Sequence, residues 1–127
     1  MSAPLAVEGC TLEIVGGTGS EPSNDSTPSS VVFADGKGVY FKEIAFSVSD
    51  VNAGDITNGD GEGSGTIPAS GSNILDADGN AAVLEGDISA EITVNGTKPA
   101  PGGGTTSASG KIKVKVSAAG QSVVIAL

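Results

Sequence analysis

The last part of the chain carries its most regular alternation of apolar and polar positions. Lysine alternates with an apolar residue throughout residues 111–116, which read Lys-Ile-Lys-Val-Lys-Val. A period of two residues is typical of a β-strand with one buried face. Ala119 and Gly120 follow, and residues 123–127 form another apolar run. We therefore expect a hairpin in which 111–116 pairs with 123–127.

The same period recurs earlier in the chain. Residues 5–15 alternate toward their end and predict a half-buried strand. Residues 31–34 and 39–48 are apolar runs separated by Asp-Gly-Lys-Gly at 35–38, where the glycines favour a hairpin turn. The run 39–48 alternates Ile, Phe and Val with small residues and holds the single Tyr of the chain. We expect it to be the best-packed strand.

Segments rich in Gly, Pro, Ser or Asp separate these runs, and we expect loops at 16–30, 50–65 and 99–109. No segment shows an apolar stripe at helical spacing between capping residues. The 127 residues suffice for one small domain, and its apolar supply is mainly Val, Ile, Leu and Ala. We predict an all-β fold: a single domain over 1–127 of short stacked hairpins, cone-like, with long Gly/Pro/Ser loops and little or no helix.

Two further turns are expected in the second half of the chain. Residues 66–87 predict a ribbon that turns at Asp78-Gly79. A second strand pair is expected around Asn95-Gly96, running from 88–94 to Thr97.

Charge and targeting signals restrict the possible partners. The chain carries 15 acids against 6 bases, a net charge of −9. Such a surface repels phosphates, so we expect no nucleic-acid partner. The N-terminus has no basic region followed by an apolar run, and no apolar run approaches membrane-spanning length. We expect a protein made in the cytoplasm without a signal peptide.

The candidate chemistry is sparse. Histidine is absent, which removes the commonest general base and zinc ligand. The single Cys10 has neither a disulfide partner nor an imidazole partner, so we expect it to pack as a small apolar residue and the protein to have no enzymatic activity. Lys111, Lys113 and Lys115 would share one strand face. They favour contact with an acidic partner or, more commonly, a solvated face that discourages edge-to-edge aggregation.

One short segment is a weak candidate for a metal site. Asp76, Asp78 and Asn80 place oxygen atoms at alternate positions around a Gly, as part of a calcium loop does. The bidentate Glu and the flanking helix of such a loop are missing, so a hairpin turn is the favoured interpretation. The acidic residues of 55–62 are interpreted in the same way. We expect no cofactor.

Residues 78–87, Asp-Gly-Asn-Ala-Ala-Val-Leu-Glu-Gly-Asp, resemble a recurring phrase of the PAAR and PAAR-like spike-tip proteins of contractile phage tails and contractile injection systems. The shared pattern is a Gly, a short residue, two small residues, an apolar step and then Gly-Asp. Residues 63–67 and 71–74 resemble the Gly-rich segment before that phrase. Residues 4–10 are similar, more loosely, to the first turn of the family. Matching segments cover about half of the chain.

The resemblance implies a small β-rich cone in the tail or baseplate spike of a virion or injection particle. It would cap a trimeric β-helical spike protein and meet the target cell envelope first. One chain on a three-fold partner would use three similar surfaces asymmetrically. Many members hold zinc with His and Cys, which this chain lacks, so zinc is not expected. The residues expected to contact the spike are Ile112, Val114, Val116, Val123 and Ile125.

Two other functions stay open at this point. A β-rich capsid decoration or cement protein fits the acidity, the loops and the hairpins nearly as well. A calcium-binding adhesive module is a weaker alternative.

Overall fold

The computed structural model describes residues 3–126, and this part of the chain consists of β-strands joined by turns and loops, without helix. The predicted all-β class is therefore confirmed. The strands are β1 (Ala3–Pro4), β2 (Thr11–Val15), β3 (Ser23–Asn24), β4 (Phe33–Ala34), β5 (Lys37–Gly38), β6 (Glu43–Val51), β7 (Gly61–Pro68), β8 (Gly71–Leu75), β9 (Ala81–Ala82), β10 (Ile92–Pro99), β11 (Thr105–Ala118) and β12 (Ile125–Ala126).

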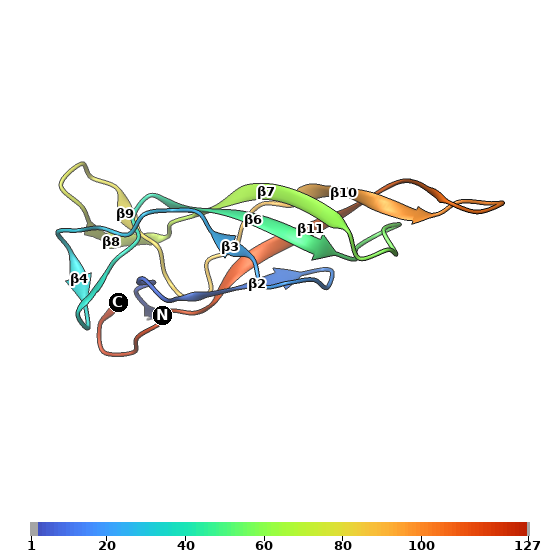
Figure 1. Cartoon of the computed structure of the whole chain (residues 1–127). Coiled ribbons are helices and arrows are strands. Elements are labelled where there is room, and N and C mark those ends of the chain that lie inside the picture. The colour runs from blue at the N-terminus through green and yellow to red at the C-terminus, as the bar shows by residue number, and fades with distance from the viewer. Residues whose placement is uncertain (1–2, 127) are drawn as a thin grey trace.

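Six strands form the main sheet in the order β2-β11-β10-β7-β6-β3, and all neighbours are antiparallel. The sheet is twisted and curls into a half-barrel (Figure 1). The β6–β7 and β10–β11 hairpins supply its four central strands. β2 lies beside β11 and β3 lies beside β6, so the first part of the chain provides both edges.

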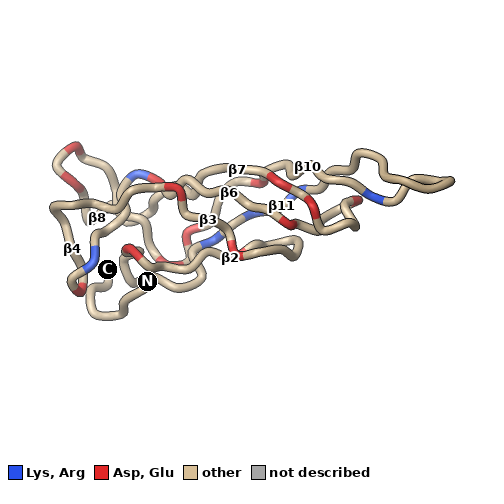
Figure 2. The backbone as a smooth tube through the Cα atoms, viewed as in Figure 1, with Lys and Arg blue, Asp and Glu red and all other residues tan. Residues whose placement is uncertain are grey.

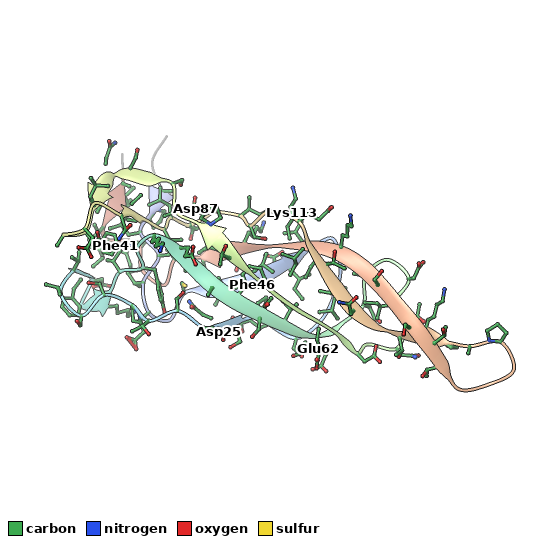
Figure 3. All side chains as sticks on the ribbon, turned by 90° about the horizontal axis from the view of Figure 1, so that it is seen from above. Asp25, Phe41, Phe46, Glu62, Asp87 and Lys113 are labelled. Carbon is green, nitrogen blue, oxygen red and sulfur yellow. The ribbon has the colours of Figure 1, made fainter. Side chains whose placement is uncertain are left out.

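The core of the half-barrel comes mainly from alternate residues of two strands. The alternation in the sequence correctly indicated which residues of β6 and β11 are buried. The lysines between the buried positions of β11 face outward, as Lys113 does in Figure 3. The buried residues of these two strands include Ile44, Phe46, Val48, Ile112, Val114 and Val116.

The molecule is broad at one end and narrow at the other (Figure 1). Three two-stranded ribbons gather at the broad end, formed by β1 with β12, β4 with β5, and β8 with β9. At the narrow end, the β10–β11 hairpin extends beyond the rest of the sheet. We call residues 97–107 the arm. The ribbons share a second buried cluster, which consists of Leu5, Val7, Ala34, Val39, Ala82 and Ala126.

The predicted hairpin between 111–116 and 123–127 is wrong. β11 pairs with β10 and β2, whereas β12 pairs with β1. Leu127, the last residue of that prediction, lies outside the described residues. Gln121 holds the intervening chain in an irregular loop: its Oε1 accepts two backbone N–H groups at 2.8 Å, and its Nε2 donates to the Leu5 carbonyl at 2.9 Å. These bonds direct the end of the chain toward its beginning.

All three predicted loops are interrupted by strands. β3 lies within 16–30, the ends of β6 and β7 lie within 50–65, and β11 begins inside 99–109. The Gly-rich start of β7 is a strand because neighbouring side chains cross it. A Cβ at Gly65 would lie 2.8 Å from Cγ2 of Ile92 and 3.0 Å from Cζ of Phe46.

Two of the predicted turns are confirmed, and a third is wrong. The turn between β4 and β5 is confirmed, and so is the turn over 76–80 between β8 and β9. The turn at Asn95-Gly96 is wrong, because Asn95 lies inside β10, opposite Glu62 of β7 and Ser109 of β11. Pairing on both sides outweighs the local turn preference of Asn-Gly.

We predict that Gly110→Ala destabilises the fold by about 1–3 kcal/mol, as overpacking does. The loop between β6 and β7 crosses β11 at this position, and a Cβ there would lie 2.3 Å from the carbonyl oxygen of Ala53. Urea unfolding measures the change. Ser107→Ala on the same strand is the control and should stay within about 0.5 kcal/mol of the wild type. Equal stability of both variants would contradict the crossing.

Candidate functional site

Three short segments close a ring of backbone hydrogen bonds at the broad end. They are residues 5–7, 39–41 and 82–84, and we call them the ring segments. The middle residue of each segment donates its N–H to the middle residue of another. The residue that follows each segment donates its N–H to the carbonyl of the residue that precedes the remaining segment. The donor–acceptor pairs are Ala6–Val83 (2.8 Å), Tyr40–Ala6 (3.1 Å), Val83–Tyr40 (2.9 Å), Glu8–Gly38 (2.9 Å), Lys42–Ala81 (2.8 Å) and Glu85–Pro4 (3.0 Å).

The pattern of these bonds is that of a three-fold axis. Each segment gives one bond to each of the other two and receives one from each, so the three are equivalent in connectivity. The antiparallel bridges repeat the cycle, joining Leu5 to Leu84, Val7 to Val39 and Phe41 to Ala82. One chain therefore builds a pseudo-three-fold element from three separate parts of its sequence.

The surroundings of the ring repeat as well. Two ring segments follow directly after β1 and β5, and the third begins at Ala82, the last residue of β9. Two of the segments are followed by Glu-Gly, in the runs Leu-Ala-Val-Glu-Gly at 5–9 and Ala-Val-Leu-Glu-Gly at 82–86. This repeat is visible in the sequence, but its copies are separated by unequal distances, and the sequence reasoning missed it.

An exposed apolar side chain occupies the same place in each ribbon. Ile125 is 45 % exposed, Phe33 is 57 % exposed and Leu75 is 55 % exposed. Each lies opposite the residue that immediately precedes a ring segment: Pro4, Gly38 or Ala81 respectively. We call Phe33, Leu75 and Ile125 the apolar trio. Val31 and Val123 add exposed apolar surface in the loops beside β4 and β12.

Two of the five residues predicted to contact a partner are exposed at the broad end. Val123 is 71 % exposed and Ile125 belongs to the apolar trio. Ile112, Val114 and Val116, by contrast, are buried, because β11 is a central strand whose apolar face packs in the core. These three residues are therefore not available to a partner. Phe33 and Leu75 were missed, although each is an apolar residue next to a turn, in a strand that has only one neighbouring strand.

A groove of about 420 Å³ lies between two of the ribbons. It is lined by Ala3 and Ala126 on one side and by the start of β8 and residues 84–87 on the other. The acidic groups at the groove are held by the protein itself. The Asp87 carboxylate accepts from the Leu84 N–H (2.8 Å) and from Ser70, and Glu85 accepts from the Ala119 N–H (3.0 Å). The groove adds shape to the broad end rather than a reactive group.

The calcium candidate is a hydrogen-bonded turn. The Asp76 carboxylate accepts from the N–H groups of Asp78 (2.9 Å) and Asn80 (2.8 Å) and from Asn80 Nδ2 (3.1 Å). These bonds, that from the Asn80 N–H first, lower the pKa of Asp76. Within residues 3–126, no group of three or more acidic, Cys or His side chains is arranged to hold a metal ion.

Cys10 is half-buried beside β3. Burial raises the pKa of its thiol, and Asn24 Nδ2 approaches Sγ at 3.8 Å. A raised pKa disfavours the thiolate that nucleophilic chemistry requires. The structure therefore places Cys10 in a packing role.

The lysines of β11 alternate with its buried residues, so they form a row on the outer face of the sheet. Figure 2 marks their positions along the strand. Lys111 lies 3.9 Å from Glu91, and both side chains are mainly exposed. Lys115 lies opposite Glu13 of β2. Exposed pairs of this kind contribute about 0–1 kcal/mol, so the row is a solvated face with acidic neighbours from the same chain.

Asp60 fixes the base of the arm. Its Oδ1 accepts the Thr97 N–H at 2.8 Å and its Oδ2 accepts the Thr97 hydroxyl. The hydroxyl first, and then the N–H, lower the pKa of the Asp60 carboxyl. The Thr97 carbonyl accepts from the N–H groups of Thr57 and Asn58, so the loop between β6 and β7 covers this edge of β10.

None of the described residues forms a helix long and apolar enough to cross a membrane. Comparisons with protein-family models, with curated proteins and with solved structures gave no match for this chain.

We predict that the base of the arm loosens in acid. The pKa of Asp60 is lower in the folded chain than in the unfolded chain, where it is about 3.9. Its contribution to stability is therefore present above that value and is lost as the pH falls through the folded pKa. The amide resonance of Thr97 should shift in this range in an NMR titration. Asp60→Asn keeps one acceptor and cannot titrate, so an identical shift in that variant would contradict the assignment.

We predict that neither calcium nor a chelator changes the melting temperature, because the Asp76 oxygens already accept three hydrogen bonds. Thermal unfolding with added calcium and with a chelator measures this. A calcium-dependent rise that disappears in Asp76→Asn would show that the turn binds the ion.

Proposed function

We propose that this protein is a structural tip that caps the trimeric central spike of a contractile tail or injection system and helps to pierce the target envelope. The observation that carries the proposal is the pseudo-three-fold ring, with one exposed apolar side chain at the same place in each of its three ribbons. A single chain that repeats a surface three times suits a partner with three identical subunits.

The chemistry of the broad end supports its attachment to the spike. An exposed apolar residue is ordinary, but a group of them at one end of a molecule is typical of an interaction surface. Burying one such side chain fully is worth about 1.5–3 kcal/mol. The ring segments beneath the trio are joined by backbone hydrogen bonds, so the surface is organised before a partner arrives.

The narrow end has the opposite character. Lys98 is the only charged residue between 97 and 110, and all the other residues there are Gly, Ala, Pro, Ser or Thr. Figure 2 shows this end mostly free of acidic and basic residues. Pro99 and residues 101–107 are exposed, and Ala100 between them is half-buried. A slender end without large side chains is suited to lead the particle, while the broad end is attached to the spike.

A capsid decoration protein is a second candidate, and the arm is the observation that favours it. An arm that extends beyond the body can reach a neighbouring subunit of a lattice. The two functions differ in copy number, because a tip is present once per tail and a decoration protein many times per particle. Imaging the assembled particle, or comparing band intensities with a major structural protein, separates them.

We predict that replacing any member of the apolar trio by Asp weakens co-purification with the trimeric spike by about tenfold, because a charge would be buried against the partner. Phe33→Asp, Leu75→Asp and Ile125→Asp should have similar effects, since their positions are equivalent. Thr106→Asp in the arm is the control and should bind as the wild type does. Undiminished binding of all three variants, or hundreds of copies per particle, would refute the proposed function.

A further inference from the structure

The half-barrel is left open along one line. β2 ends the sheet on one side, and on the other the chain from Thr18 to Asn24 runs along β6. Thr18 exchanges both backbone hydrogen bonds with Asn52, at 2.8 and 3.0 Å. Residues 12–14 and residues 17–22 are thus the two walls of a gap, which we call the seam. The Asn24–Cys10 contact lies at one end of the seam, and the turn at Gly16 lies at the other.

The direction of the backbone groups follows from the pairing of β11. Its residues Val114 and Val116 accept hydrogen bonds from the 86–89 segment, on the β10 side. Since bonding direction alternates along a strand, Lys113 and Lys115 bond toward β2, where they lie opposite Val15 and Glu13.

The N–H and C=O groups of Leu12 and Ile14 therefore point away from β11, into the seam. Among residues 3–126, no hydrogen bond reaches these groups across the seam. An edge with unpaired backbone groups is a template for another strand.

The seam holds a cleft of about 360 Å³ with an acidic rim. Glu13 lies on one wall and Glu21 on the other, and Ser20 on the same wall donates a hydrogen bond to Asp50 at 2.8 Å. No Lys lines the cleft. Ile14 contributes an apolar side chain, with its Cδ1 close to Gly19.

β11, the strand already paired with β2, indicates which kind of strand fits the free edge of β2. Along the edge of β2 that pairs with β11, Leu12 and Ile14 lie opposite valines, while Glu13 lies opposite Lys115. A strand presents the same side chains to both of its neighbours. An alternation of apolar and basic residues therefore matches the outer side of β2 as well, and the Glu21 side of the cleft adds to the preference for basic residues.

We propose that the seam binds an extended segment of a partner protein in which apolar residues alternate with Lys or Arg, added as a strand to the outer edge of β2. The apolar residues of the segment exchange hydrogen bonds with Leu12 and Ile14, and a basic residue lies beside Glu13. This site is separate from the apolar trio, so its test does not depend on the proposed function.

The probe is a synthetic peptide, Lys-Ile-Lys-Val-Lys-Val, which reproduces residues 111–116. With the full chain in saturating peptide, NMR hydrogen exchange should slow at the amides of Leu12 and Ile14. A peptide of the same composition without alternation, and one with Glu in place of Lys, should leave both amides unchanged. No protection by the alternating peptide, or equal protection by all three peptides, would overturn the proposal.

Two variants separate the backbone and charge contributions. Ile14→Pro removes an N–H that faces the seam and leaves the bonds to β11, as proline on an edge strand does; we expect peptide affinity to fall roughly threefold to tenfold. Glu13→Lys should lower it about tenfold. Glu62→Lys makes the same charge change on β7 and is the control. If the seam amides are protected in the chain alone, in step with its self-association, the occupant is a second copy and the proposal is wrong.

Discussion

The closed ring of backbone hydrogen bonds at the broad end is the constraint on which the rest of the structure depends. Its three segments come from residues 5–7, 39–41 and 82–84, so closing it fixes the relative positions of distant parts of the chain. The middle residues of all three segments are buried. Their backbone groups would be costly to leave unpaired, and the cyclic pattern satisfies each of them in turn. The three ribbons then have defined places because each one leads directly into a ring segment. The sheet begins on the other side of the ring, where Glu43 starts β6 one residue after Lys42 has turned the chain.

Local patterns predicted the strands better than their partners. The alternation of Lys with Ile and Val in 111–116 identified a strand and its buried face, since that information lies in neighbouring residues. It did not identify the partner, because an alternating strand can pair with any other, and β10 and β2 were both more favourable than 123–127. Glycine misled the prediction for a physical reason. In β7, glycine leaves room for Phe46 and Ile92 to cross the strand, whereas a sequence pattern treats such glycines as loop. The turns at 35–38 and 76–80 were predictable because their cause is local.

In the candidate site, too, some features follow from local sequence and others from the whole fold. Ile125 and Val123 were predicted at a contact surface because they lie in an obvious apolar run, and they are exposed. Ile112, Val114 and Val116 look equally apolar in sequence but lie in the core. Exposure depends on how many neighbours a strand has, which is a property of the whole fold. The pseudo-three-fold ring is harder still to predict, because its segments are unequally spaced and only two of them share the Glu-Gly that follows. The sequence reasoning expected one chain to use three similar surfaces asymmetrically, and it did not foresee a pseudo-three-fold ring within the chain itself.

A tip on a trimeric spike faces a mismatch of symmetry, and the ring suggests how it can be resolved. An asymmetric chain that touched only one subunit would leave two equivalent surfaces of the spike uncovered and would be held at one point off the axis. Under the proposed function, three equivalent apolar contacts would place the chain on the axis and share an axial load among the subunits. Exact symmetry is required only where contact occurs, so Phe33, Leu75 and Ile125 can differ in size while their backbone positions correspond. The remainder of the chain is then free of the symmetry and can form the asymmetric half-barrel, its open seam and the arm.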